Sequence, residues 1–266
     1  GSVSIPNTPI AVTNIAGELG FSREGGLFAE GIRGKMWQQP LTAAFFKTDT
    51  DQFIALRTVA APKSLNQLVE FPWDEVLIGD IPIEGLVTIE QGGVASSPVT
   101  LQLTSQMQST EIKLPQPLGK RVGDKLPLDL TLYFNPDFTR LAGSIGSKLV
   151  TDLRFSELTV THGLVSYDRS ISMPAKGKLL VASFLPTTDL NLWRPVSALF
   201  TNKFSGNNKS LRSVFDLEFE RLEVSPLTLH DIAAQVRLSD EMIDIGFRSD
   251  LADGRLLLPF NDKSVP

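Results

Sequence analysis

The chain has 266 residues, 42% hydrophobic content and a formal net charge of −5, so it can bury a substantial core as one large domain or two smaller ones. The negative charge argues against nucleic-acid binding, since the scattered basic residues form no stripe that could follow a phosphate backbone. The chain has no cysteine, which excludes disulfides, thiolate metal sites and cysteine nucleophiles, and fits an oxidising compartment.

The stretch 14–46 predicts an antiparallel meander of short strands. Apolar residues alternate with other residues over 15–19, 27–32 and 41–46, with turn residues at 22–26 and a break at Arg33–Gly34. A single helix over 28–44 is the alternative, but its interior would hold Gly31, Gly34 and Pro40, at about 1 kcal/mol per Gly and about 3 kcal/mol for Pro. The strand interpretation is therefore favoured.

The same alternation continues to the C-terminus and is clearest where Leu128, Leu130 and Leu132 alternate with polar residues. A short helix is expected over Lys63–Glu70, with Ser64 as N-cap and 71–73 as its end, and a second helix over 189–200, where Pro195 either kinks the helix or marks its first turn. Loops are expected at 114–127 and 201–210. The remaining strands are expected at 51–60, 85–91, 99–104, 111–114, 128–133, 140–145, 149–155, 157–167, 177–184, 215–220, 227–238, 242–249 and 255–260.

About fifteen strands with turn signals every 8–12 residues or so favour a sandwich, a barrel or an elongated curved sheet, and periodicity does not separate these. The uniform pattern of one apolar and one charged side, with few Trp or Tyr residues to fill a closed interior, favours the third. We expect an all-β fold with two short helices, in which an elongated, curved antiparallel sheet forms an open groove. Small basic clusters at Lys120–Arg121 and at Lys203, Lys209 and Arg212 are expected to lie in solvated loops.

The expected organisation is one continuous structural unit made of successive segments. Residues 1–2 resemble the remnant of a cleaved tag, and the missing initiator Met suggests a piece of a longer protein. No run approaches the roughly 18 apolar residues that span a bilayer, and no signal peptide is visible. A groove segment over 3–72 and a repeat over 73–200 each end in a short helix, and 201–266 begins the next segment. Trp73 and Trp193 mark the helical elements, a spacing that hints at a long repeat.

Three stretches resemble YhdP-type proteins of the AsmA-like superfamily. They are GELGF followed by GGLFAEGIRGKMWQQPLTAAF near the start, LPQPLGKRVGDKLPLDLTL in the centre, and DLNLWRPVSALF with DLEFERLEVSPLTLHDIAAQVRLSDEMIDIGFRSDLADGRLLLP near the end. Each motif consists of common residues, but their order and spacing follow the family over nearly the whole chain.

This resemblance implies a protein of the Gram-negative envelope, anchored in the inner membrane by an N-terminal helix that this chain lacks and extending through the periplasm. It implies a bridge-like lipid transfer protein that carries phospholipid between inner and outer membranes along repeating β-groove units. The implied partners are phospholipid acyl chains, neighbouring repeats and the inner membrane.

A groove lined by Val, Leu, Ile and Phe suits this role, because keeping acyl chains out of water is worth about 0.8 kcal/mol per CH₂. The same side chains could equally form the closed core of a non-catalytic structural or interaction module, whose strand edges pair with a neighbour. The residues expected to line the groove are Leu101, Leu103, Leu128, Leu130, Leu132, Phe215, Leu217, Phe219, Ile243, Ile245 and Phe247.

Catalysis is not expected. The two histidines, His162 and His230, lie in separate strands and are interpreted as surface or edge residues, without carboxylates at metal-ligand spacing. No G-x-S-x-G motif is present, and the Gly-rich stretches do not open a helix after a buried strand. No cofactor or metal is therefore predicted.

Overall fold

The structure is a computed structural model that describes residues 1–4, 11–22, 26–48, 51–67, 71–90, 99–156, 159–201, 211–238 and 242–259. Its contacts divide into two compact units. The first contains Gly1–Lys113, Gly119–Gly146 and Ser156–Leu158, and the second contains Leu114–Leu118, Ser147–Phe155 and Thr159–Pro266. The division after Gly146 lies inside the segment 73–200 expected from the sequence.

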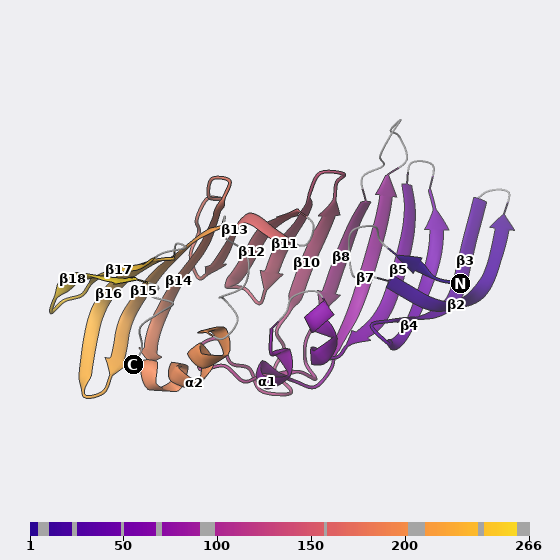
Figure 1. Cartoon of the computed structure of the whole chain (residues 1–266). Coiled ribbons are helices and arrows are strands. Elements are labelled where there is room, and N and C mark those ends of the chain that lie inside the picture. Colours follow the sequence, from indigo (N-terminus) through magenta and orange to yellow (C-terminus); the bar gives the residue numbers. More distant parts are fainter. Residues whose placement is uncertain are drawn as a thin grey trace. The chain divides into compact units, whose positions relative to one another are not determined.

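The described part of the first unit contains an antiparallel sheet of nine strands (Figure 1). Neighbours in the order β1-β2-β3-β4-β5-β7-β8-β10-β11 are hydrogen-bonded, and the first and last of these strands are not neighbours, so the sheet of this unit is open. The strands are β1 (Val3–Ser4), β2 (Ala11–Ser22), β3 (Gly26–Met36), β4 (Gln39–Lys47), β5 (Asp51–Ala60), β7 (Ile81–Glu90), β8 (Val99–Ser105), β10 (Leu128–Phe134) and β11 (Thr139–Ile145).

Strand β3 continues through Arg33 and Gly34, so the break predicted there is wrong. Gly34 pairs with Leu41 of β4, and a Cβ atom on Gly34 would lie 2.9 Å from a methyl carbon of Val12. The glycine therefore permits a close approach of β2 within the sheet and does not end the strand. The turn follows instead at Trp37 and Gln38, both of which have positive φ angles, 51° and 65°.

Short elements of the first unit lie at one end of its strands. They are the 3₁₀ helix η1 (Pro62–Gln67), the single-turn helix α1 (Trp73–Val76), and a small sheet of β6 (Leu77–Ile78) with β9 (Glu111–Ile112). The predicted helix at 63–70 is thus a 3₁₀ turn as far as 67, and 68–70 lie outside the described residues. Ser64 lies inside η1 and is not its cap: its hydroxyl donates to the Trp37 carbonyl oxygen at 3.4 Å.

The predicted loop at 114–127 carries no strand, but one of its basic residues is not solvated. Lys120 is buried, and its ammonium group donates to the carbonyl oxygens of Thr110 (2.5 Å) and Arg121 (3.0 Å). These bonds satisfy the buried cation and anchor the loop. Lys203 and Lys209 of the other predicted basic cluster, with most of the loop 201–210, lie outside the described residues.

In the second unit, the described strands follow the order β12-β13-β14-β15-β16-β17-β18 (Figure 1). Strand β14 is parallel to both β13 and β15, whereas the pairs from β15 to β18 are antiparallel. The sequence predicted an antiparallel sheet, and the two parallel pairs of β14 depart from that prediction. The strands are β12 (Leu149–Ser156), β13 (Thr159–Tyr167), β14 (Lys178–Asp189), β15 (Arg212–Val224), β16 (Leu227–Leu238), β17 (Met242–Arg248) and β18 (Asp253–Pro259).

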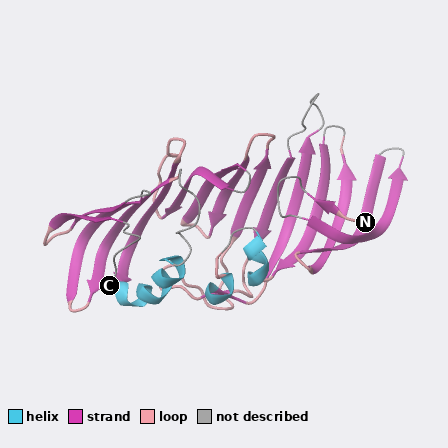
Figure 2. Cartoon of the chain, viewed as in Figure 1, coloured by secondary structure: helices cyan, strands magenta, loops and turns pink. Residues whose placement is uncertain are grey.

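The parallel pairs arise from the two connections that flank β14. Parallel neighbours require a crossover that returns the chain to the starting end. The loop 168–177 provides the first crossover, and helix α2 (Leu190–Thr201) belongs to the second connection (Figure 2). Asp189 accepts the Asn191 backbone N–H at 2.8 Å and caps α2, so Pro195 lies inside the helix and not in its first turn.

Candidate functional site

One face of the first unit's sheet is hydrophobic across seven strands, from β3 to β11. Residues directly opposite each other on paired strands point to the same face, so the strand register defines rows that cross the sheet. Two adjacent rows contain no polar or charged side chain. One row is Ala29, Phe45, Ile54, Val87, Leu101, Leu132 and Leu141, and the other is Ile32, Ala43, Leu56, Gly85, Leu103, Leu130 and Gly143.

The opposite face of this sheet contains a fully polar row. A row crossing β4 to β11 reads Thr42, Arg57, Glu84, Thr104, Asp129 and Ser144. Arg57 and Glu84 form an exposed ion pair at 3.1 Å, and the Gln102 amide donates to the Asp129 carboxylate at 3.2 Å. The adjacent row on this face is mixed: Ala44, Ala55, Leu86, Gln102, Thr131 and Ala142. The sheet of this unit therefore has one hydrophobic face and one more polar face.

The hydrophobic face of the first unit is only partly covered. Leu101 is buried, with 3% of its surface exposed, whereas Leu103, Leu128, Leu130 and Leu132 are all half-buried. Fully packed core residues are removed from solvent on all sides. The described side chains of this unit therefore leave part of the face accessible.

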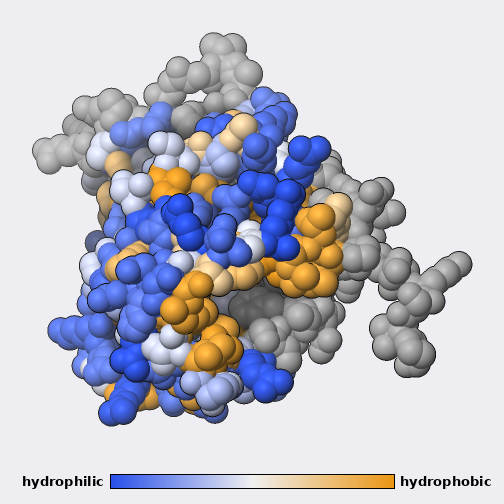
Figure 3. Space-filling model, turned by 90° about the vertical axis from the view of Figure 1, so that its left-hand side faces the viewer, coloured by the Kyte–Doolittle hydropathy of each residue, from blue (hydrophilic) through white to orange (hydrophobic). Residues whose placement is uncertain are grey.

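The second unit repeats this arrangement. Rows across β14 to β18 again place the predicted side chains together: Phe215 lies opposite Val181 and Val236, and Ile245 lies opposite Val236 and Leu256. The next row contains Ser183, Leu217, Ala234, Phe247 and Gly254. Ile243 pairs with Leu238 and Leu258. Figure 3, viewed from the side of β17 and β18, shows hydrophobic side chains gathered in patches among hydrophilic ones.

One end of this second face is packed. Leu185, Phe219, Leu222 and Ile232 form a buried cluster, against which Tyr167, Leu217, Val224 and Leu229 pack. Phe219 is 8% exposed, whereas Phe215 and Leu217 on the same strand are half-buried and Phe247 is 40% exposed. The face thus changes along the strands from accessible to closed.

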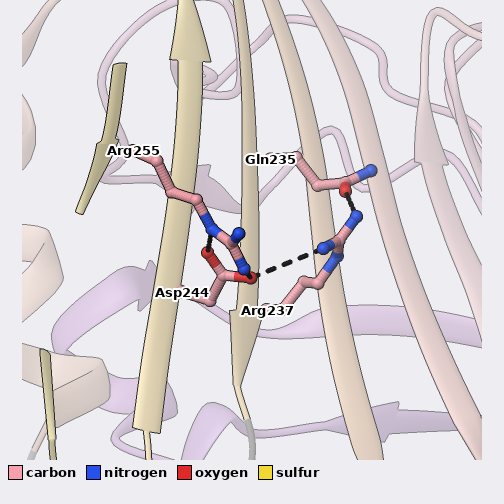
Figure 4. Close-up of polar contacts among 4 residues, drawn as sticks. All are labelled: Gln235, Arg237, Asp244 and Arg255. Atoms are coloured by element: carbon pink, nitrogen blue, oxygen red, sulfur yellow. Dashed lines mark hydrogen bonds and ion pairs between the residues drawn. The ribbon is translucent and has the colours of Figure 1, made fainter. Parts of the chain in front are cut away.

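The opposite face of the second unit carries two charge networks. Arg169, from the crossover loop 168–177, forms ion pairs with Asp216 at 3.2 Å and Glu218 at 3.1 Å. Asp244 on β17 accepts two hydrogen bonds from Arg255 at 2.8 and 2.9 Å, and one from Arg237 at 3.4 Å (Figure 4). The hydrogen bonds from Arg255 hold the pKa of Asp244 below its ordinary value.

A shallow hollow of about 580 Å³ lies beside the Asp244 network. Its lining includes Ala233, Gly246, Arg248 and Arg255, which belong to the polar rows of β16 to β18. It also includes Ala234, Phe247 and Gly254 of the hydrophobic row. The hollow is therefore not confined to either face, and its lining is partly charged.

The histidines do not form a reactive centre. His162 is half-buried in β13, where its ring nitrogen Nδ1 lies 3.3 Å from the Thr161 hydroxyl, and burial lowers its pKa. His230 is exposed on β16, where its backbone N–H donates to Asp250 at 3.0 Å. Among the described residues, no group of three or more His, Cys, Asp or Glu residues is placed to hold a metal ion.

The eleven residues expected to line a groove fall on the hydrophobic face of their own unit. Leu101, Leu103, Leu128, Leu130 and Leu132 come together in the first unit, and the other six in the second. Leu101 and Phe219 lie in packed surroundings. The prediction from the sequence did not include five residues that belong to the same rows: Phe45, Ile54, Val87, Val181 and Val236. Period-two alternation could have identified them, because they lie in the expected strands at 41–46, 51–60, 85–91, 177–184 and 227–238.

Together, the fold and these faces define an all-β protein with open sheets, each of which has a more polar face and a partly accessible hydrophobic face. The chain matches the family described as YhdP protein over residues 1–265 and belongs to that family. No curated protein and no solved structure matches the chain. In the described residues, none of the helices is both long enough and apolar enough to cross a bilayer.

Proposed function

We propose that this chain is a periplasmic segment of a bridge-like lipid transfer protein, and that its hydrophobic faces carry phospholipid acyl chains between the inner and outer membranes. The observation that carries the proposal is the pair of hydrophobic rows from β3 to β11, whose leucines, except the buried Leu101, remain half-buried. Membership of the YhdP family supports a place in the cell envelope and a transport role rather than catalysis.

Moving a lipid through water exposes its acyl chains and carries a large free-energy cost. Each CH₂ group kept out of water contributes about 0.8 kcal/mol, so a two-chain phospholipid needs a continuous apolar path. Contacts made by Leu, Val, Ile and Phe are non-directional, so neighbouring positions along a row bind a chain with similar strength. A lipid can then move without breaking strong hydrogen bonds. In the whole protein, neighbouring repeats and an N-terminal inner-membrane anchor complete the proposed path.

The test is to purify the chain from bacterial envelope, extract it with organic solvent and identify the lipids by mass spectrometry. Phospholipid is expected in the extract of the wild type. Leu130→Asp in the first unit and Leu217→Asp in the second place a charge on the hydrophobic faces, and each is expected to lower the bound lipid. Both positions are half-buried, so the folded state is expected to survive.

The matched control is Thr131→Asp, because Thr131 neighbours Leu130 on β10 and lies opposite Gln102 on the polar side. It introduces the same charge and is expected to leave the lipid content unchanged. Wild-type protein without phospholipid, or equal lipid loss in Leu130→Asp and Thr131→Asp, contradicts the proposal. If Leu130→Asp and Leu217→Asp both fail to fold, the result supports the alternative in which these side chains form a closed core.

A second candidate is a structural module that associates through strand edges. The observation in its favour is β18, the last described strand of its sheet, where Leu256, Leu257 and Leu258 are all exposed, at 49%, 50% and 41%. Exposed apolar edge strands tend to pair with another chain. This candidate predicts concentration-dependent association in sedimentation velocity and no lipid in the extract.

A further inference from the structure

The packed cluster of the second unit lies across the path that an acyl chain would follow along the strands. We infer that Leu185, Phe219, Leu222 and Ile232, here called the wall, limit how far an acyl chain extends on this face and so select chain length. The inference rests on the proposed function, since it concerns the same hydrophobic face. It adds a property of the ligand, the length of its acyl chain.

The wall is formed by three neighbouring strands at the same level. Leu185 of β14 lies opposite Phe219 of β15, which lies opposite Ile232 of β16. All three side chains are buried. On the side of the wall away from α2, the face is open: Phe215 and Leu217 on β15, and Ala234 and Val236 on β16, are half-buried.

On the α2 side of the row formed by Leu185, Phe219 and Ile232, the alternation of buried and exposed side chains is interrupted. This interruption adds a second layer of apolar side chains to the wall. Glu220 and Arg221 are both exposed, although they are consecutive, and the next residue, Leu222, is buried in the same cluster as Phe219. Facing them on β16, His230 and Asp231 are also both exposed, and Asp231 has a φ of 52°. Because two consecutive residues are exposed, the next side chain, Leu222, points to the same side as Phe219. The wall therefore contains both Phe219 and Leu222.

The open face in front of the wall is long enough to hold an acyl chain. From Ser213 to Phe219 the strand advances six residues, which is about 20 Å at roughly 3.3 Å per residue. The hydrocarbon core of a bilayer is about 30 Å thick, so the chains of one leaflet extend about 15 Å. A chain aligned with the strands therefore fits the open part, and a chain that is longer by more than about 5 Å meets the wall.

Ala234 occupies the last row before the wall. It lies opposite Leu217 on one side and Phe247 on the other. Its small side chain leaves space that a larger residue would fill. Ala234→Leu therefore moves the effective wall forward, whereas Phe219→Ala removes part of it.

The experiment compares the purified wild type, Ala234→Leu and Ala233→Leu for binding of diacyl phospholipids that share one headgroup and differ in chain length. Ala233 is the next residue on β16 and lies on the opposite face, opposite Glu218 and Arg248, so Ala233→Leu is a control with the same change in volume. Ala234→Leu is expected to shift the preference to shorter chains, with affinity for longer ones falling about fourfold per excluded methylene, which corresponds to about 0.8 kcal/mol.

Phe219→Ala is the opposite variant and is expected to admit longer chains. Phe219→Ala also removes a buried side chain and can destabilise the fold. The test therefore depends on Ala234→Leu, which removes no buried side chain. If the wild type binds lipid and Ala234→Leu shows the same chain-length preference, the inference that the wall selects chain length is wrong. It is also wrong if Ala233→Leu shifts the preference as much as Ala234→Leu. Absence of lipid binding by the wild type at every chain length instead overturns the proposed function.

Discussion

Two phenylalanines on one strand test whether the hydrophobic face of the second unit is open. Phe215 and Phe219 both belong to β15 and point to the same face, four residues apart. Phe219 is 8% exposed and belongs to the buried cluster, whereas Phe215 is half-buried. Phe215→Ala and Phe219→Ala therefore make the same chemical change in two different surroundings.

The expected losses of stability differ by a factor of about three. For Phe219→Ala the free energy of unfolding should fall by about 3–5 kcal/mol, because a buried aromatic leaves a cavity in a packed cluster. For Phe215→Ala the fall should be about 1–1.5 kcal/mol, roughly half the transfer free energy of a fully buried side chain, without a cavity contribution.

Urea unfolding of the second unit can be followed by fluorescence of Trp193, which lies in α2, after the other two tryptophans, Trp37 and Trp73, are replaced by Phe. The midpoint shifts at constant slope give the two free-energy differences. Equal losses of 3 kcal/mol or more from both variants would refute the open face, since Phe215 would then be packed as tightly as Phe219. A large loss of lipid binding is expected for Phe215→Ala.

Two further predictions concern the sheets themselves. Gly143→Ala should lower the free energy of unfolding by at least about 2 kcal/mol, because a Cβ on Gly143 would lie 2.0 Å from the Asp129 carbonyl oxygen at a φ of 154°. Gly246→Ala, where a Cβ meets nothing within 4 Å, is the control and should be nearly neutral. Because Gly143 lies in the first unit and Gly246 in the second, urea unfolding of both variants is followed by circular dichroism, which reports on the strands of both units. Because Arg255 holds the pKa of Asp244 down, the ion pair stabilises the fold above the ordinary aspartate pKa, and that contribution is lost as pH falls through the lowered folded pKa. The difference in unfolding free energy between wild type and Asp244→Asn should therefore shrink on acidification; a difference that stays constant with pH would contradict this assignment.

The sequence by itself determined which side chains share a face. Leu128, Leu130 and Leu132 alternate with polar residues, and alternation is a local property of an extended chain, because successive side chains point to opposite sides. The same rule put Phe215, Leu217 and Phe219 on one side of their strand, and Ile243, Ile245 and Phe247 on one side of theirs. That the two sides belong to one face follows only from the pairing of both strands with β16. The strand bounds at 51–60 and 227–238 were also predicted correctly from the alternation.

Only the tertiary structure decided how the strands are ordered and how deeply each face is packed. The parallel pairing of β14 depends on the crossovers through 168–177 and α2, and neither leaves a mark in the alternation of the strands. Phe215 and Phe219 have the same local pattern, yet only Phe219 meets Leu185 and Ile232 in a closed cluster. Burial depends on side chains brought from distant parts of the sequence, so a period-two pattern gives the direction of a side chain but not what covers it.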